Sequence, residues 1–473
     1  MKKHLTYAIL ILLISVMILP TLNAETTKNK LENQFFLNGS DDVNYAFSLL
    51  ILTPKNFLRQ LKPLYDHKNE LGITTKMVTL REVYDQTSSG RDEAEKIKYF
   101  IKQAIESWNT QYVLLVGGMK HQRFNSWHLP VRYVGMDDDW EHHYVSDLYF
   151  ADIYDSTGNF SSWDSDGDGI YGEWPYDSIA EDQDIDLYPD VYVGRLPCRN
   201  KYEVKIMVNK IITYENEAYG NPWFNDMICI AGDTYPEHLN PLWVGYEGEY
   251  YADRALENMS DFNPVTLYAS DETFTGQKDV INAVNQGCGF LYFVGHGNPK
   301  SWGNHPPDGE EFIDGLSTYT MHKLKNKEKL PVCVVSGCHN SQFDVSLWRI
   351  LNRRSRYLGE AAAECWGWRM TRRIGGGSIA TVGCSALGYT KEDKVSFSGG
   401  LNELESLFFK AYGQDDITIV GETFSTAITS YLDTYTPIHW NTTAVGDSFI
   451  DVKVVQSWVL FGDPSLQIGG YNK

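Results

Sequence analysis

Two short apolar segments, each ending in a glycine-flanked reactive side chain, constrain this chain more than any other feature. One runs from Phe290 to Gly297 and presents His296, and the other runs from Pro331 to Cys338. Apolar runs of this length without polar alternation indicate strands buried on both faces of a parallel sheet. The carboxyl ends of parallel strands share one edge, where α/β proteins place their sites. We therefore expect His296 and Cys338 to meet there as a base and a nucleophile, although either residue alone is more often structural.

Strands and helices alternate along the rest of the chain, which predicts an α/β fold with mainly parallel sheets. Residues 45–221 and 222–473 are predicted to form two α/β subdomains, and a long aromatic and acidic insertion at 119–186 interrupts the first. Besides the two segments above, the predicted strands are 47–53, 74–79, 111–118, 191–193, 227–231, 265–268 and 377–382. The predicted helices are 55–71, 91–108, 201–219, 247–259, 280–285, 358–370, 401–412 and 417–432.

The charge composition limits the kinds of partner that the protein is expected to bind. The net charge is -21 and the pI is about 5.0. This argues against nucleic acid, because phosphate binding needs clustered Lys and Arg, whereas divalent cations or cationic substrates fit an acidic chain. The seven cysteines leave at least one unpaired in a secreted protein. A reactive Cys338 with few or no disulfide bonds is the simplest account.

The first 24 residues have the pattern of a secretory signal peptide. Lys2-Lys3 precedes an apolar core at 8–19, and residues 22–24 form a plausible cleavage site. An uncleaved membrane anchor is the alternative, but the apolar run is short for a bilayer span. With residues 25–44 as a polar leader and no later membrane span expected, the sequence predicts a secreted, extracellular or surface-associated protein.

The acidic insertion contains the first half of a calcium-binding loop, with carboxylates at alternate positions followed by a turn glycine. The candidate ligands are Asp164, Asp166, Asp168, the carbonyl of Ile170, and Glu173 or Asp177 in place of the usual last glutamate. Aligned carboxylates repel one another without a cation, so we expect a structural Ca²⁺ here. A solvated acidic loop is the alternative.

A Cys–His pair at a sheet edge suits attack on a carbonyl carbon. The thiolate attacks, and the imidazole takes the thiol proton and later returns a proton to the leaving group. The resulting oxyanion needs backbone N–H donors. Gly297 directly follows the histidine, so we predict its N–H as one donor and the N–H of Cys338 as a second.

The two reactive segments resemble the catalytic blocks of the gingipain family of cysteine peptidases. The matching residues are 292–297 with Trp302 after them, and 335–340 with Phe343 after them. Three flanking segments are also similar to the family, and the resemblance covers roughly residues 45–468. Those segments are 50–57 with the following Lys68 and Gly72, the strand 112–117, and the closing motif 460–466.

This resemblance implies a caspase-like α/β/α three-layer sandwich with His296 as the base and Cys338 as the nucleophile. It assigns Asp233 as the acid that orients the histidine, and a turn-capping role is the alternative. It also implies an acidic pocket for Arg or Lys before the cleaved bond. The candidate substrate-binding residues are Glu249, Glu247, Tyr389 and Trp302. Acids in the first turn of a helix also stabilise its dipole without any substrate.

Together these features predict a secreted, calcium-stabilised cysteine endopeptidase that acts on proteins or peptides, with no catalytic cofactor. Two alternatives are open: an inactive calcium-dependent adhesion or binding protein, and a transpeptidase that passes the acyl group to an amine. The intact His296, Gly297 and Cys338 argue against the first. Hydrolysis and transfer differ only in the access of water to the acyl-enzyme.

Overall fold

The computed structural model describes residues 46–124, 126–138, 140–175, 179–238, 245–391, 399–435 and 447–472. The predicted signal peptide at 1–24 and the leader at 25–44 lie outside the described residues. Within the described part, no helix combines the length and the apolar character that crossing a membrane requires.

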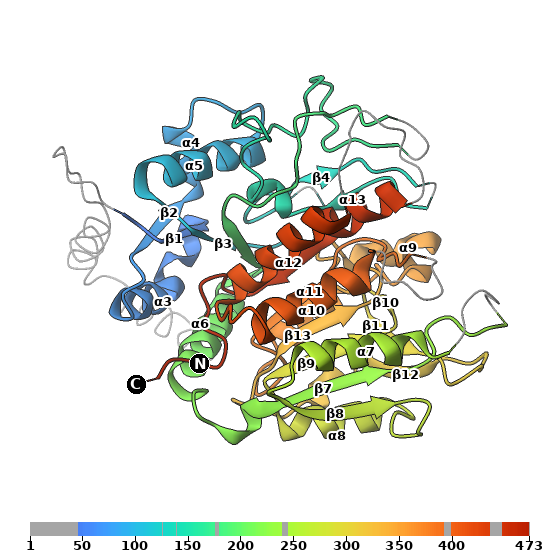
Figure 1. The fold of residues 1–473 in the computed structure, drawn as a ribbon. Coiled ribbons are helices and arrows are strands. Elements are labelled where there is room, and N and C mark those ends of the chain that lie inside the picture. The colour runs from blue at the N-terminus through green and yellow to red at the C-terminus, as the bar shows by residue number, and fades with distance from the viewer. Residues whose placement is uncertain are drawn as a thin grey trace, which may run out of the picture. The chain divides into compact units, whose positions relative to one another are not determined.

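One sheet of ten strands runs through this part of the chain, in the order β2-β1-β3-β6-β15-β14-β13-β9-β7-β8 (Figure 1). Its strands are β1 (Leu49–Thr53), β2 (Thr75–Thr79), β3 (Tyr112–Val116), β6 (Tyr192–Leu196), β7 (Asp226–Ala231), β8 (Asn263–Tyr268), β9 (Phe290–Val294), β13 (Val332–Ser336), β14 (Ala380–Cys384) and β15 (Trp458–Phe461). The predicted α/β class and mainly parallel sheet are confirmed, and strands from both predicted subdomains join in this one sheet.

The sheet consists of two parallel halves that run in opposite directions. Strands β2, β1, β3, β6 and β15 are parallel to one another, and so are β14, β13, β9, β7 and β8. The halves meet where β15 pairs antiparallel with β14, with Val382 opposite Leu460. The last strand of the chain therefore lies in the middle of the sheet.

Helices cover both faces of the sheet, which gives three layers (Figure 1). They are α3 (Leu58–Glu70), α4 (Leu80–Gln86), α5 (Glu93–Trp108), α6 (Lys201–Glu217), α7 (Glu247–Asn258), α8 (Gln277–Gln286), α9 (Arg353–Tyr357), α10 (Trp366–Thr371), α11 (Leu401–Gly413), α12 (Val420–Tyr435) and α13 (Asp447–Ser457). The predicted helix 358–370 is wrong over 358–365, because the chain turns at Gly359, whose φ is +82°. Only glycine adopts that conformation at little cost.

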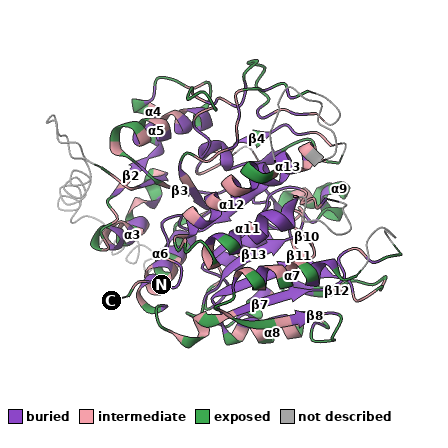
Figure 2. Cartoon of the chain, viewed as in Figure 1, coloured by how far each residue is buried: buried purple, intermediate pink, exposed green. Residues whose placement is uncertain are grey.

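The side chains of β9 show how the two helical layers are packed. Leu291 and Phe293 belong to a core cluster that includes residues of α8 and α10. Phe290 and Tyr292 point to the opposite face, where their rings contact Phe409 of α11. Strands buried on both faces in this way explain the continuous apolar runs in the sequence, and they are drawn as buried in Figure 2.

Two small antiparallel sheets complete the described part of the fold. Strands β4 (Tyr133–Val134) and β5 (Tyr144–Val145) lie in the acidic insertion. Strands β10 (His296–Asn298), β11 (Ser301–Asn304) and β12 (Ile313–Ser317) follow β9 directly and were not anticipated from the sequence. The second of these sheets positions one of the two candidate catalytic residues.

Candidate active site

His296 and Cys338 are brought together by the register of neighbouring strands. Strands β9 and β13 pair in parallel, with Val294 opposite Ser336. Each reactive residue comes two positions after its paired strand residue, so both extend past the same edge. They line one pocket together with Thr234, Tyr235, Tyr251, Gly388, Thr390 and other residues. Its volume of about 30 Å³ has room for only one or two water molecules.

The ring of His296 is oriented by a backbone carbonyl. Its Nε2 lies 2.7 Å from the carbonyl oxygen of Thr234. A carbonyl can only accept, so Nε2 carries the proton and Nδ1 keeps the free electron pair. Burial lowers the pKa of His296, although the Thr234 hydrogen bond opposes that shift. The ring is therefore neutral near pH 7, with Nδ1 available as a base.

Among the described residues, three aromatic rings surround the imidazole of His296. The rings of Tyr235, His305 and Phe312 contact it edge-on, with centroid distances of 5.6, 5.6 and 5.4 Å. These contacts restrict the rotation of the imidazole and keep its free nitrogen in a fixed direction.

Asp233 directly precedes Thr234, whose carbonyl holds the ring of His296. The carboxylate of Asp233 makes its own contacts with Asp308 and Glu247. Its Oδ2 accepts from the backbone N–H of Asp308 at 2.8 Å. Its carboxyl group also faces that of Glu247, and a hydrogen bond between the two requires one of them to be protonated. Among the described contacts of His296, the orienting acceptor is the Thr234 carbonyl. The orienting role of Asp233 stays a prediction.

Cys338 sits in the turn that follows β13. Its Sγ lies 3.7 Å from the carbonyl oxygen of Gly388, which forms another wall of the pocket. Burial raises the pKa of the Cys338 thiol. The sulfur therefore carries its proton at neutral pH and needs a base to form the thiolate. The six other cysteines are all buried and free, so Cys338 is the accessible thiol.

Gly297 and Gly337 pack against Asn340, which explains why both positions lack a side chain. A Cβ at Gly297 would lie 2.0 Å from Asn340 Oδ1, and one at Gly337 would lie 2.4 Å from the same atom. Asn340 Nδ2 donates to the carbonyls of Asn298 and Ser301 at 2.9 and 3.1 Å. The buried amide thus connects β10 to the turn that carries Cys338 and brings the Gly297 backbone beside that residue.

The two predicted substrate-binding glutamates have different surroundings. Both oxygens of Glu249 are used by Ser270, whose N–H and Oγ–H donate at 2.9 and 2.5 Å. Glu247 accepts from the backbone N–H of Tyr235 at 3.2 Å, and Tyr235 lines the pocket that His296 and Cys338 share. Burial, together with the nearby Asp233, raises the pKa of Glu247 to about 7. Glu247 is therefore the acid that a hydrogen bond links to a residue lining the pocket.

The two predicted aromatic contacts also differ from each other. Tyr389 follows the pocket residue Gly388, and its hydroxyl donates to Asp138 Oδ2 at 2.6 Å. Trp302 is 2% exposed, and its indole N–H donates to the carbonyl of Ser336 at 3.0 Å. This buried position favours a packing role for Trp302 behind the pocket over direct contact with substrate.

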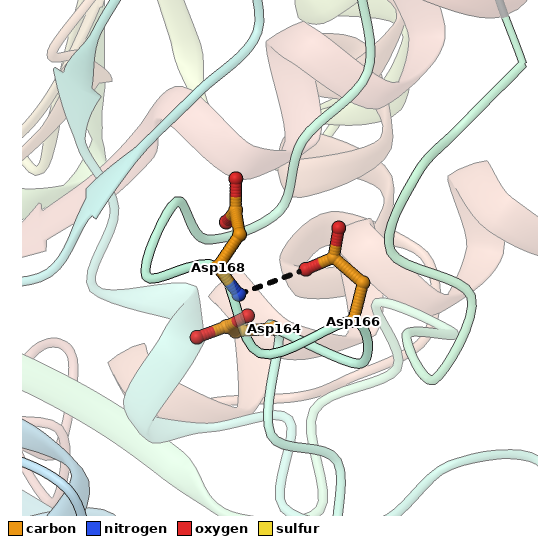
Figure 3. Close-up of side chains that lie close together, drawn as sticks. All are labelled: Asp164, Asp166 and Asp168. Atoms are coloured by element: carbon orange, nitrogen blue, oxygen red, sulfur yellow. Dashed lines mark hydrogen bonds between the residues drawn. The ribbon is translucent and has the colours of Figure 1, made fainter.

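The acidic loop draws three carboxylates together, as Figure 3 shows for Asp164, Asp166 and Asp168. One oxygen of each lies within 4.8 Å of the others, a spacing at which they could hold a metal ion. Asp168 and Asp166 are also linked through a backbone N–H at 3.1 Å. Arg91 Nη1 lies 2.6 Å from Asp164 Oδ2 and neutralises part of the charge. Oxygen ligands of this kind suit Ca²⁺.

Other acids extend the negative field of this loop. Burial and neighbouring carboxylates raise the pKa of Glu173 to about 7, and burial raises that of Asp182 to about 7. The Asp182 carboxylate accepts from the N–H groups of Ser165 and Glu173, at 2.5 and 3.1 Å. Ile170 lies in the same loop and is 36% exposed. The predicted ligand Asp177 lies outside the described residues.

Three contributors to the site were missed in the sequence. Thr234 acts through its backbone, which carries no sequence signal. Asn340 was visible next to the reactive cysteine, but its contact with Gly297 was not. Glu141, which contacts His339, lies 198 positions away in the insertion.

Comparison with known proteins identifies the fold and the sequence family. Residues 43–469 match the model described as peptidase family C25. A protein of Archaeoglobus fulgidus is 24% identical over 394 residues, covering 80% of this chain and 86% of that protein. Gingipain R2 of Porphyromonas gingivalis is 21% identical over 299 residues, covering 62% of this chain but only 32% of the relative.

The structural comparison agrees with the sequence comparison. The crystal structure of the Arg-specific cysteine proteinase gingipain R aligns with a TM-score of 0.61 at 16% identity. The alignment covers 91% of this chain and 80% of that chain. This likeness confirms the gingipain-like, caspase-like α/β fold that the sequence predicted.

Proposed function

This chain belongs to peptidase family C25, and from that premise we propose that it is a cysteine endopeptidase with Cys338 as the nucleophile and His296 as the general base. The observation that carries the proposal is the pocket that the two residues share at the end of β9 and β13. Family membership implies protein or peptide substrates.

The proposed reaction follows from the protonation states of the pair. Nδ1 of His296 takes the proton from Cys338 Sγ, and the sulfur attacks the carbonyl carbon of the scissile bond. The N–H groups of Gly297 and Cys338 stabilise the oxyanion. The intermediate collapses as His296 returns the proton to the leaving amine, and water then hydrolyses the thioester.

The test is cleavage of a mixed fluorogenic peptide library by the wild type and by Cys338→Ala. Cleavage by the wild type that disappears in the variant supports the peptidase. Amide transfer products in the mass spectrum would favour the transpeptidase instead. A folded wild type that cleaves nothing, and whose Cys338 resists alkylation, would favour a binding protein.

We also propose that the enzyme cleaves after Arg or Lys, with Glu247 as the acid that meets the substrate's cation. Glu247 and Asp233 face each other, and a guanidinium beside them would favour the ionised form of both carboxyls. Glu249 is the matched comparison, because Ser270 already satisfies both of its oxygens. Glu247→Gln should reduce kcat/KM for Arg substrates at least tenfold, and Glu249→Gln much less. The opposite order would overturn the assignment.

Two further parts of the proposal concern location and metal. Secretion is supported by the signal-like pattern of residues 1–24. Asp164, Asp166 and Asp168, with the Ile170 carbonyl, would hold a Ca²⁺ that orders the acidic insertion. Such an ion would be structural, because the thiol chemistry above needs no metal.

A further inference from the structure

Glu141, a residue of the acidic insertion, contacts three separate segments near Cys338. Glu141 Oε1 lies 3.0 Å from Nε2 of His339, the residue after Cys338. Glu141 Oε2 accepts from the backbone N–H of Leu387 at 3.1 Å and lies 3.2 Å from Lys453 Nζ. One carboxylate therefore joins the nucleophile turn, the segment before Gly388 and helix α13.

The backbone at His339 requires such support. Its φ is +58°, a left-handed conformation that non-glycine residues adopt at a cost. Its N–H donates to the carbonyl of Ala386 at 2.8 Å. Side chain and backbone thus hold His339 from two directions, and the direction of the Cys338 Sγ depends on the turn that they fix.

The negative charges of Glu141 and Asp138 near Cys338 are balanced by the buried Lys453. The Lys453 side chain is fully buried and pairs with Asp138 Oδ2 at 2.6 Å as well as with Glu141. Burial opposes ionisation of Glu141, but the His339 hydrogen bond and the charges of His339 and Lys453 outweigh it and lower its pKa. Lys453 favours the thiolate of Cys338, and Glu141 disfavours it.

We propose that Glu141 is a positioning residue for the nucleophile: through His339 it fixes the turn that carries Cys338, and through Leu387 it fixes the facing wall of the pocket. Lys453 holds Glu141 in its charged, bridging position. The proposal rests on the peptidase function above, but the reactivity of the Cys338 thiol tests it even if no peptide is cleaved.

The experiment measures the rate of Cys338 alkylation by iodoacetamide against pH, with Cys338→Ala as the blank. The titratable groups that face or flank the thiol are His296, His339, Glu141, Lys453, Tyr389 and Cys384. Glu141→Gln should move the midpoint to lower pH, because it removes a negative charge near the thiol, and Lys453→Met should move it to higher pH, because it removes a positive charge. Equal midpoints in all three proteins would show that this network does not act on the thiol.

Peptide kinetics test the positioning itself. Glu141→Gln and His339→Gly should each reduce kcat by about ten- to a hundredfold with little change in KM, since small misplacements of a reacting atom have effects of this size. Glycine keeps the left-handed turn without the side chain, so His339→Gly remains informative if Glu141→Gln fails to fold. Glu203→Gln, which alters a buried carboxylate paired with Arg199, is the matched control.

The outcomes separate the two proposals. Opposed alkylation shifts without any peptide cleavage would show that the network acts on the Cys338 thiol, as the proposal requires, and would overturn the peptidase. Folded Glu141→Gln and His339→Gly proteins with kcat and an alkylation profile within twofold of the wild type would overturn the positioning role. A kcat loss in Glu203→Gln as large as in Glu141→Gln would also overturn it.

Discussion

The contact between Gly297 and Asn340 predicts a large and specific effect of one methyl group. In Gly297→Ala the new Cβ would lie 2.0 Å from Asn340 Oδ1 and 2.6 Å from its Cγ. Asn340 is fully buried, so its amide has to move. It then loses the hydrogen bonds to Asn298 and Ser301, each worth about 1 kcal/mol, while overpacking adds about 1–3 kcal/mol. We expect Gly297→Ala to lower the free energy of unfolding by about 3–5 kcal/mol.

A double-mutant cycle tests this reasoning. Asn340→Ala alone should cost about 2–4 kcal/mol, because it leaves two carbonyls without their donor. Adding Gly297→Ala to that variant should cost little more, since the clashing amide is gone. The assay is urea denaturation followed by circular dichroism, with all four proteins measured together. Additive effects of the two substitutions would refute the steric argument.

Two other predictions concern stability. Ca²⁺ should raise the Tm of the wild type by several degrees. That rise should be lost in Asp166→Asn and Asp168→Asn but kept in Asp155→Asn, whose carboxylate caps a turn in the same insertion. Equal rises in all four proteins would contradict the proposed calcium site. Lys68→Met should cost about 3–5 kcal/mol, because Lys68 is fully buried between Glu215 and Asp463 at 2.7 and 2.9 Å. Lys62→Met, which breaks an exposed pair on the same helix, should cost under about 1 kcal/mol, and similar losses in both variants would contradict the burial argument.

The sequence predicted the parts of the fold that depend on local pattern. Strands β9 and β13 were recognisable because they are buried on both faces and carry uninterrupted apolar residues. Strands β10 and β11 were not recognisable, because residues 296–304 are polar and rich in glycine and pair only with each other and with β12. Helix 358–370 was overextended, because apolar spacing continued past a glycine that terminates regular structure.

The parts of the site that depend on one side chain could be predicted from the sequence. The parts that depend on the backbone or on a distant segment could not. His296 and Cys338 were found from their place after apolar strands, and the pocket that they share agrees with that placement. A carboxylate was expected to orient the histidine, whereas the acceptor at Nε2 is the carbonyl of Thr234. Every residue has a carbonyl, so no residue type could indicate this contact.

The position of β15 in the middle of the sheet determines when the two halves of the sheet can pair. Strands β6 and β14 are joined only through Trp458–Phe461, which come near the end of the sequence. Until a ribosome has released these residues, the growing chain exposes two unpaired strand edges, which are prone to pair with other chains. The two halves of the sheet can therefore join only after residues 458–461 have been synthesised. A chain truncated before residue 458 should expose the edges of β6 and β14 and aggregate.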